Sequence, residues 1–340
     1  MNGKERIQKV LNGEMPDRTP VMLHNFLMAI RENGYTVEQY RKEPKIIAEV
    51  FEKTVYKYDV DGILLDMDTA LLSSLVGVET DYPADEPARN HAGLIQSLDE
   101  VEHLKEVDFS VSRAMVYLEA AQRLVEKIGK DIYIRGNCDQ AAFSLAGLIR
   151  GTEDFLVDIL TEEEEKVRAL LEYASGVTCS FMSLMAETGV DMLSNGDSSA
   201  GPDMVSPSIY KTFAYPYEKQ IVHHCHKLGL PYLLHICGDT TDILDEMVDT
   251  GADCLELDYK TDIQAIRKAT KDKTVFVGNL DPSGVICMGS KEAVIEKTKE
   301  LMESQKNNPR FIFNAGCAIP AITPAENVMA MLDVVRNYRG

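Results

Sequence analysis

Residues 232–258 read YLLHICGDTTDILDEMVDTGADCLELD and contain the clearest strand–helix–strand pattern of the chain. The two ends of this stretch, residues 232–237 and 254–258, are short hydrophobic runs with the length and composition of β-strands. The residues between them have the apolar spacing of a helix. A strand, a helix and a second strand in this order predict a right-handed βαβ unit, in which the two strands lie parallel in one sheet.

The same alternation continues along the whole chain. Helical stretches such as residues 45–58, KIIAEVFEKTVYKY, separate successive hydrophobic runs. We count eight such runs, at residues 20–24, 60–66, 131–137, 190–195, 232–237, 254–258, 275–280 and 310–316. Eight strand–helix units in 340 residues favour an α/β protein of the (β/α)8 TIM-barrel class over a doubly wound sheet.

We expect one barrel domain that spans residues 1–340. The sequence has no linker-like, low-complexity or strongly repeated segment. Pro16 and Pro20 separate residues 1–19, which we expect to form a short N-terminal helical extension, from the barrel. A longer segment between the second and third strands contains Pro, Gly and acidic residues, and it predicts a loop with extra helix beside or over the barrel mouth.

The composition bears on the class of protein. Hydrophobic residues make up 45% of the chain, which is ample for a large core. The net charge of −20 argues against nucleic-acid binding, because a phosphate backbone needs a basic surface. There is no secretory signal and no apolar run long enough to span a bilayer, so we expect no membrane association. Seven cysteines do not suggest a disulfide framework, and we expect a reducing, cytoplasmic location.

Polar side chains are concentrated where the predicted strands end. In (β/α)8 barrels the chemistry lies at the carboxyl ends of the strands, so these residues are candidates for a site. They are His24, Asn25, Asp66, Asp68, Asn137, Cys138, Asp139, Asn195, Asp197, His235, Cys237, Asp239, Glu256, Asp258, Asn279, Asp281, Asn314 and Cys317. Some members have an ordinary explanation as turn formers or helix caps, above all Asp139, Asp239 and Asp281.

Three of these residues indicate a metal site. His235 and Cys237 stand two apart at the end of a strand, so their side chains project from the same face. Cys317 follows the eighth strand and would meet them across the barrel mouth. One His, two Cys and an open position are typical of catalytic zinc, whereas a lone His or Cys in a strand is usually a core residue. Our candidate for an exchangeable fourth ligand is Asp258, with Glu256 as the second choice.

Other patterns are less informative. The cluster HHCH at 223–226 lies in a helical stretch, where consecutive residues point in different directions. The segment GDSSAG at 196–201 is not the G-x-S-x-G of a nucleophile elbow. Neither a G-x-G-x-x-G after a strand nor a Walker A sequence is present, which disfavours nucleotide-cofactor and phosphate chemistry.

Several segments resemble the uroporphyrinogen decarboxylase superfamily. The resemblance covers nearly the whole chain and implies a distorted (β/α)8 barrel, in agreement with the strand count. The segments stand in the order and spacing of that family, and they are MPDRTPV (15–21), LLDMDTALLSSLVGVE (64–79), GDSSAG (196–201), SPSIYKTFAYPYEKQIV (206–222), HICGD (235–239) and VGNLDP (277–282).

The decarboxylase branch of this superfamily fits only in part. True decarboxylases carry an arginine-rich segment after the first strand that binds substrate carboxylates. Here His24, Asn25 and Phe26 stand in its place, and those arginines are absent. Asp68 does match the decarboxylase aspartate, but one aspartate cannot hold an octacarboxylate.

The second branch comprises the cobalamin-dependent methyltransferases. They resemble this chain in their zinc ligands, a His-x-Cys pair and a distant Cys, which correspond to His235, Cys237 and Cys317. In that branch the corrinoid is carried by a separate protein. This chain lacks the D-x-H-x-x-G motif of a corrinoid-binding domain, so the resemblance implies a corrinoid-binding protein as its partner, docked at the barrel mouth.

The resemblance leaves two directions of methyl transfer open. In one, a zinc-bound thiol such as coenzyme M accepts the methyl group from the corrinoid. In the other, the corrinoid takes it from a methoxylated aromatic, an O-demethylation. Asp68 would move protons or orient substrate in either case, beside Asp258 as the exchangeable ligand. The residues expected to bind substrate are His24, Asn137, Asp197 and Asn314, with Asn279 a weaker candidate.

Two other classes of function compete with this interpretation. One is a metal-independent decarboxylase of a smaller or less acidic substrate, centred on Asp68. The other is a non-catalytic barrel that only binds a corrinoid protein. Bound zinc would distinguish a methyltransferase from the metal-independent decarboxylase. A non-catalytic barrel would instead tolerate loss of the three ligands.

Overall fold

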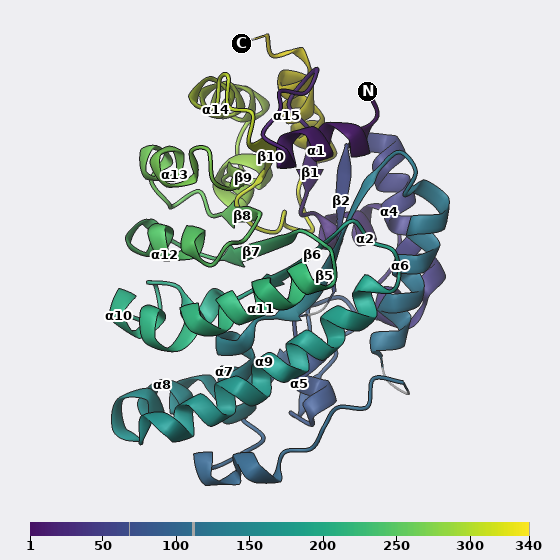
Figure 1. Ribbon diagram of the computed structural model, residues 1–340. Helices are drawn as coiled ribbons and strands as arrows, with labels where there is room; N and C mark the ends of the chain where they lie inside the picture. Colours follow the sequence, from purple (N-terminus) through teal and green to yellow (C-terminus); the bar gives the residue numbers. More distant parts are fainter. Residues whose placement is uncertain (68, 111–112, 340) are drawn as a thin grey trace.

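The computed structural model describes residues 1–67, 69–110 and 113–339. Its centre is an eight-stranded parallel sheet in the order β1-β2-β5-β6-β7-β8-β9-β10, which follows the order of the chain (Figure 1). A parallel bridge between Val21 and Phe313 joins the first strand to the last and closes the barrel. The strands are β1 (Met22–Leu23), β2 (Gly62–Leu65), β5 (Tyr133–Gln140), β6 (Met192–Gly196), β7 (Tyr232–Ile236), β8 (Cys254–Leu257), β9 (Val275–Leu280) and β10 (Phe311–Ala315). The predicted (β/α)8 barrel is confirmed, and each predicted strand overlaps an observed one.

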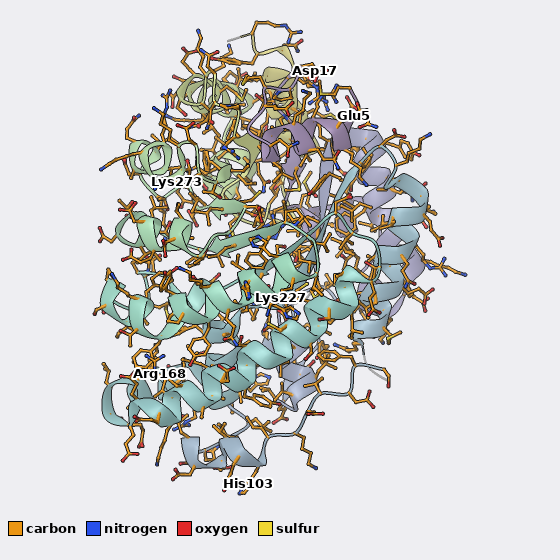
Figure 2. The ribbon with its side chains drawn as sticks, in the orientation of Figure 1. Glu5, Asp17, His103, Arg168, Lys227 and Lys273 are labelled. Carbon is orange, nitrogen blue, oxygen red and sulfur yellow. The ribbon has the colours of Figure 1, made fainter. Side chains whose placement is uncertain are left out.

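Helices surround the barrel and pack their apolar faces on it (Figure 1). Exposed side chains such as His103, Lys227 and Lys273 lie on the outside (Figure 2). The outer helices are α4 (Pro44–Tyr58), α6 (Ala114–Ile128), α9 (Glu164–Ala186), α11 (Tyr215–Lys227), α12 (Leu244–Asp249), α13 (Ile263–Thr270), α14 (Lys291–Ser304) and α15 (Ala325–Asn337).

Further elements lie in the segments that follow the strands. They are α2 (Phe26–Glu32), α3 (Val37–Lys42), α5 (Leu71–Val76), α7 (Ala142–Arg150), α8 (Thr152–Thr161) and α10 (Pro207–Ile209), the 3-10 helices η1 (Leu98–His103), η2 (Ser198–Ala200) and η4 (Thr241–Ile243), and the π-helices η3 (Tyr210–Ala214) and η5 (Pro282–Cys287). Between β2 and β5, a two-stranded antiparallel pair, β3 (Thr80–Asp81) and β4 (Arg89–Asn90), lies in the predicted long segment together with α5 and η1. That segment therefore contains more regular structure than the predicted loop with extra helix.

The N-terminal helix α1 (Gly3–Leu11) covers the amino-terminal end of the barrel. Its Ile7 and Val10 join the apolar side chains that fill this end. Asp61, which is buried, accepts hydrogen bonds from Arg6 Nη1 at 2.9 Å and Arg18 Nη1 at 2.7 Å. One buried carboxylate thus attaches residues 1–19 to the start of β2.

The barrel interior changes from apolar to polar along the strands. Because side chains of a strand alternate between its two faces, residues two positions apart stand one above the other inside the barrel. The apolar layer contains Met22, Tyr133, Met192, Leu233, Cys254 and Ile312. Two positions further along the same strands stand His24, Arg135, Ser194, His235, Glu256 and Asn314. This second set, the polar layer, is the floor on which the candidate site is built.

One described helix, α9, is long and apolar enough to cross a membrane by length and composition alone. This differs from the expectation that no run would qualify. Half of the apolar window is buried inside the structure, and Leu170, Ala174 and Phe181 are among its fully buried side chains. Packing on the barrel accounts for the apolar composition of this helix.

Candidate metal centre

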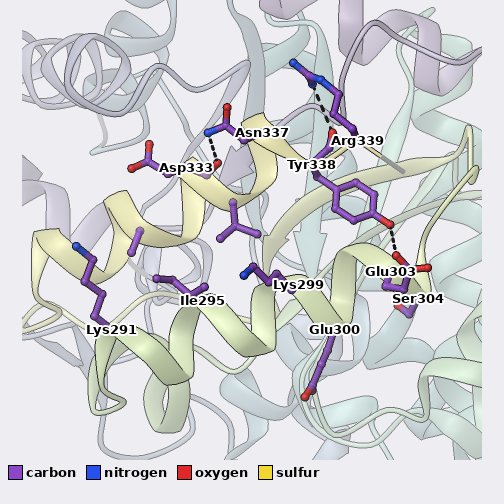
Figure 3. A pocket seen from close by; sticks show the side chains of 12 residues that line it. Lys291, Ile295, Lys299, Glu300, Glu303, Ser304, Asp333, Asn337, Tyr338 and Arg339 are labelled. Carbon is purple, nitrogen blue, oxygen red and sulfur yellow. Dashed lines mark hydrogen bonds between the residues drawn. The ribbon is translucent and has the colours of Figure 1, made fainter.

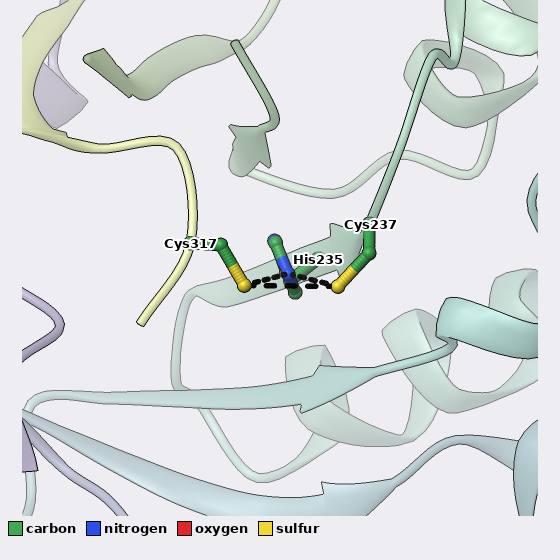
Figure 4. Close-up of side chains that lie close together, drawn as sticks. All are labelled: His235, Cys237 and Cys317. Atoms are coloured by element: carbon green, nitrogen blue, oxygen red, sulfur yellow. Dashed lines mark hydrogen bonds between the residues drawn. The ribbon is translucent and has the colours of Figure 1, made fainter. Parts of the chain in front are cut away.

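The structure brings the three predicted metal ligands together at the carboxyl ends of the strands. His235 lies near the end of β7, Cys237 follows it, and Cys317 follows β10 (Figure 4). The His235 Nε2 atom is 3.1 Å from Cys237 Sγ and 3.8 Å from Cys317 Sγ, and the two sulfurs are 3.8 Å apart. Among the described residues, this is the one group of His, Cys, Asp and Glu side chains whose ligand atoms converge in this way.

The spacing of the three ligand atoms fits zinc. Tetrahedral zinc with Zn–S bonds of about 2.3 Å and Zn–N bonds of about 2.0 Å places two sulfurs about 3.8 Å apart, and nitrogen and sulfur about 3.5 Å apart. The observed sulfur–sulfur distance equals the first value, and the two nitrogen–sulfur distances of 3.1 and 3.8 Å lie on either side of the second. The geometry and the donor set together allow a three-ligand zinc site with a fourth position for water or substrate.

The orientation of His235 is set by its other ring nitrogen. Its Nδ1–H donates to the backbone carbonyl of Glu256 at 3.0 Å, which leaves Nε2 facing the two cysteines. Such a bond selects the tautomer and the ring angle that metal binding requires. The hydrogen bond runs to the neighbouring strand β8, so the barrel sheet itself positions the imidazole.

The three side chains strongly affect each other's ionisation. The hydrogen bond with Cys317 lowers the pKa of Cys237 to about 3, against the effect of burial and with help from His235. The same contact raises the pKa of Cys317. Burial alone lowers the pKa of His235, but the adjacent Cys237 thiolate raises it to about 9. Without a metal, Cys237 is therefore the thiolate of the group, and a metal ion bound there would replace the protons that His235 and Cys317 hold.

A second polar group lies beside the cluster. His24 Nε2 is 2.8 Å from Asp66 Oδ2, and its Nδ1 is 3.1 Å from Glu256 Oε1. Arg135 Nη1 donates to the other oxygen of Glu256, and Asn137 Nδ2 donates to Asp66. The five side chains form one hydrogen-bonded chain across the barrel floor.

Positive and negative charges alternate along this hydrogen-bonded group of side chains. Burial opposes a charge on His24, but the carboxylates of Asp66 and Glu256 raise its pKa to about 10, so the ring is an imidazolium. Burial likewise opposes a charge on Glu256, but Arg135 and His24 hold its pKa well below the usual range. A substrate-binding role was predicted for His24, whereas Arg135 was not among the predicted site residues. The signal for Arg135 was available, because an arginine inside a hydrophobic strand requires a buried anion.

The carboxylate of Asp258, the predicted exchangeable ligand, lies beside the cluster and is hydrogen-bonded to the backbone. Its Oδ2 accepts a hydrogen bond from Gly238 N, and its Oδ1 accepts one from Lys260 N, both at 3.1 Å. Within the described part of the chain, it is not a member of the converging group. The bond from Gly238 N fixes the backbone that follows Cys237, and the role of Asp258 as an exchangeable ligand stays a prediction. The second choice, Glu256, instead binds Arg135 and His24.

The remaining predicted site residues differ in how near they lie to this centre. Asn137 borders it through Asp66, and Asn314 lies in the polar layer, with its Oδ1 accepting from His24 N at 3.0 Å. Asp197 is fully buried, and its Oδ1 accepts from Ser144 N at 2.7 Å. Asp68 lies outside the described residues.

Several weaker candidates have structural partners. Asn279 Nδ2 donates to the carbonyl of Asp258 at 3.2 Å. Asp281 caps η5 through Ser283 N, and Asp239 accepts from Thr241 N, as expected for turn formers. A groove of about 1190 Å³ between α14 and α15 lies on the outside of the barrel, and none of its lining residues is a predicted site residue (Figure 3).

The sequence matches the family model described as uroporphyrinogen decarboxylase (URO-D) over residues 2–338. The chain belongs to the uroporphyrinogen decarboxylase family. Its resemblance to that superfamily, inferred from short segments, is therefore confirmed over almost the full length.

Relatives within this family include proteins of two kinds. The chain is 27% identical to a protein named "Methylcobamide:CoM methyltransferase MtbA" of Methanosarcina acetivorans, over 99% of this chain and 98% of that protein. It is 25% identical to a uroporphyrinogen decarboxylase of Thermosynechococcus vestitus, over 97% of each. Among solved structures, a methyltransferase from Methanosarcina mazei matches with a TM-score of 0.87 at 20% identity, over 99% of this chain and 98% of that one. This structural match confirms the family barrel.

Proposed function

We propose that this member of the uroporphyrinogen decarboxylase family is a zinc-dependent methyltransferase. It moves a methyl group between a corrinoid carried by a separate protein and a small substrate. The observation that carries the proposal is the convergence of His235, Cys237 and Cys317 at the barrel mouth. The full-length similarity to methylcobamide:CoM methyltransferases supports it. Other relatives are named uroporphyrinogen decarboxylase, and a metal-independent decarboxylase would not require three converging soft ligands.

The three metal ligands and the other residues of the polar layer have separate roles in this proposal. His235, Cys237 and Cys317 hold zinc, which when bound supplies a Lewis acid that stabilises a substrate thiolate or a departing phenolate. His24, protonated and fixed between two carboxylates, holds positive charge beside the site. Asn314 Nδ2 is buried and has no hydrogen-bond partner among the described residues, so it is suited to bind a substrate oxygen.

The substrate is either a thiol or an aryl methyl ether. The name of the Methanosarcina relatives supports the first, with coenzyme M as the acceptor and a methylated corrinoid protein as the donor. The second, removal of a methyl group from a methoxylated aromatic, uses the same zinc ligands with the corrinoid as acceptor. Two assays distinguish them: demethylation of methylcobalamin by coenzyme M, and methylation of reduced cobalamin by methoxylated aromatics.

The proposal is tested first by metal content. Protein purified without added metal is analysed by elemental mass spectrometry, with Cys317→Ala and the control Cys179→Ala beside it; Cys179 lies on α9, outside the cluster. We expect about one zinc per chain in the wild type and the control. Cys317→Ala loses the zinc and the methyl transfer while keeping the fold. Folded wild type without zinc would contradict the proposal and favour a metal-independent decarboxylase.

A further inference from the structure

We propose that Ser198 is a positioning residue of the metal centre, whose hydroxyl donates a hydrogen bond to the Cys237 thiolate. The Ser198 Oγ atom lies 3.1 Å from Cys237 Sγ. Ser198 belongs to the GDSSAG segment, for which the sequence analysis found no role. The inference rests on the proposed zinc site and adds to it a residue that acts on zinc through one of its ligands.

The segment that carries Ser198 is attached to the strand that carries the ligands. Asp197 N donates to the backbone carbonyl of His235 at 2.8 Å, which continues the pairing of β6 with β7 by one residue. On the other side, Ser144 on α7 binds the same segment twice. Its N–H donates to Asp197 Oδ1 at 2.7 Å, and its hydroxyl accepts from Ser199 N at 3.1 Å. Ser198 is thus held by its neighbours on both sides.

A close approach of the backbone at Gly201 completes this attachment. A Cβ atom at Gly201 would lie 2.9 Å from Ile236 Cγ2 and 3.1 Å from the carbonyl oxygen of Cys237. Only glycine permits this contact without displacing one of the two segments. The end of η2 therefore lies directly on the end of β7, and the serine hydroxyl faces the thiolate.

A hydrogen bond to a ligand thiolate changes the Lewis acidity of the metal that the thiolate binds. The bond draws electron density from sulfur, so less charge reaches the metal and the metal becomes a stronger Lewis acid. It also fixes the rotamer of the ligand before the metal arrives. Partners of this kind contribute about tenfold to a hundredfold to metal affinity. A more acidic zinc would promote the ionisation of a bound thiol in one direction of transfer and would stabilise the departing phenolate in the other.

The test uses cobalt and zinc binding rather than turnover. Co²⁺ is loaded into the metal-free wild type and Ser198→Ala, and the sulfur-to-cobalt charge-transfer band is recorded. Loss of the hydrogen bond raises the energy of the sulfur lone pairs, so the band moves to longer wavelength. Zinc affinity, measured by competition with a chromophoric chelator, falls about tenfold. Ser198→Thr keeps a hydroxyl and restores both values, and Ser199→Ala serves as the matched control.

Each outcome separates this inference from the proposed function. A red-shifted band in Ser198→Ala, with recovery in Ser198→Thr and no change in Ser199→Ala, supports the inference. Gly201→Ala, which keeps the serine but displaces its segment, gives the same shift. If Ser198→Ala has the same band position and zinc affinity as the wild type, the inference is wrong and the proposed zinc site is unaffected. If the wild type binds neither cobalt nor zinc, both the inference about Ser198 and the proposed function are wrong.

Discussion

Replacing Arg135 with methionine tests whether one buried ion pair holds the polar layer together. The side chains of Arg135 and Glu256 are 4% and 0% exposed and contact each other inside the barrel. Arg135 Nε also donates to Ser194 Oγ at 2.8 Å. Methionine fills most of the volume of the arginine stem but carries no charge, so the change removes the cation and leaves Glu256 in place.

The expected loss follows from what remains around Glu256. Removing one partner of a buried ion pair costs about 3–5 kcal/mol, because the other charge stays buried and uncompensated. The hydrogen bond to Ser194 contributes about 1 kcal/mol. His24 still contacts Glu256 Oε1 and offsets part of this cost. We therefore expect the free energy of unfolding to fall by about 4 kcal/mol.

The assay is a reversible urea titration of Arg135→Met beside a surface control. Arg123→Met removes an ion pair with Glu119 whose side chains are 35% and 49% exposed, and it should cost less than about 1 kcal/mol. If Arg135→Met cost no more than this control, the buried pair would not be what stabilises the floor. In the double variant Arg135→Met/Glu256→Gln no charge is left unpaired, so part of the loss should be recovered.

Two further predictions concern buried carboxylates. Burial raises the pKa of Asp197 to about 6, so the folded protein holds a proton that the unfolded chain releases near pH 4, and stability falls as pH rises from about 4 to about 6. Asp197→Asn should remove this dependence and raise stability at pH 7 by about 3 kcal/mol, because the pKa is raised from about 4 to about 6. Thermal unfolding at a series of pH values measures both effects, and an unchanged pH dependence would refute the assignment. Asp61→Asn should leave Arg6 and Arg18 short of a counter-charge and lower stability by about 2–3 kcal/mol, with faster hydrogen exchange in α1. Exchange in α1 equal to the wild type would show that other contacts hold this helix.

The fold and the convergence of His235, Cys237 and Cys317 were predictable because they depend on strand periodicity and barrel closure. The alternation of strands and helices requires no knowledge of loops, and it led to eight strands in the correct order. His235 and Cys237 stand two apart in a strand, so their common direction follows from the backbone. Cys317 follows the eighth strand, and barrel closure brings that strand end to the same mouth.

The partners of these ligands depend on contacts that periodicity does not encode. Asp258 ends a strand beside the cluster, as predicted, but two backbone N–H groups in the turns after β7 and β8 take up its carboxylate. Ser198 reaches Cys237 because Gly201 permits a close approach between two segments. Neither turn conformation nor inter-loop packing can be derived from the order of apolar residues.

The two cysteines of the cluster are 80 residues apart in the sequence, on opposite sides of β8 and β9. A metal bound by both cysteines would join the two ends of the long segment that contains β8 and β9. A covalent link of that span removes about 4–5 kcal/mol of loop entropy from the unfolded chain. A metal that binds only the folded chain would instead add its binding free energy to the stability of the fold, so loss of the metal and unfolding of the segment between β7 and β10 would be coupled.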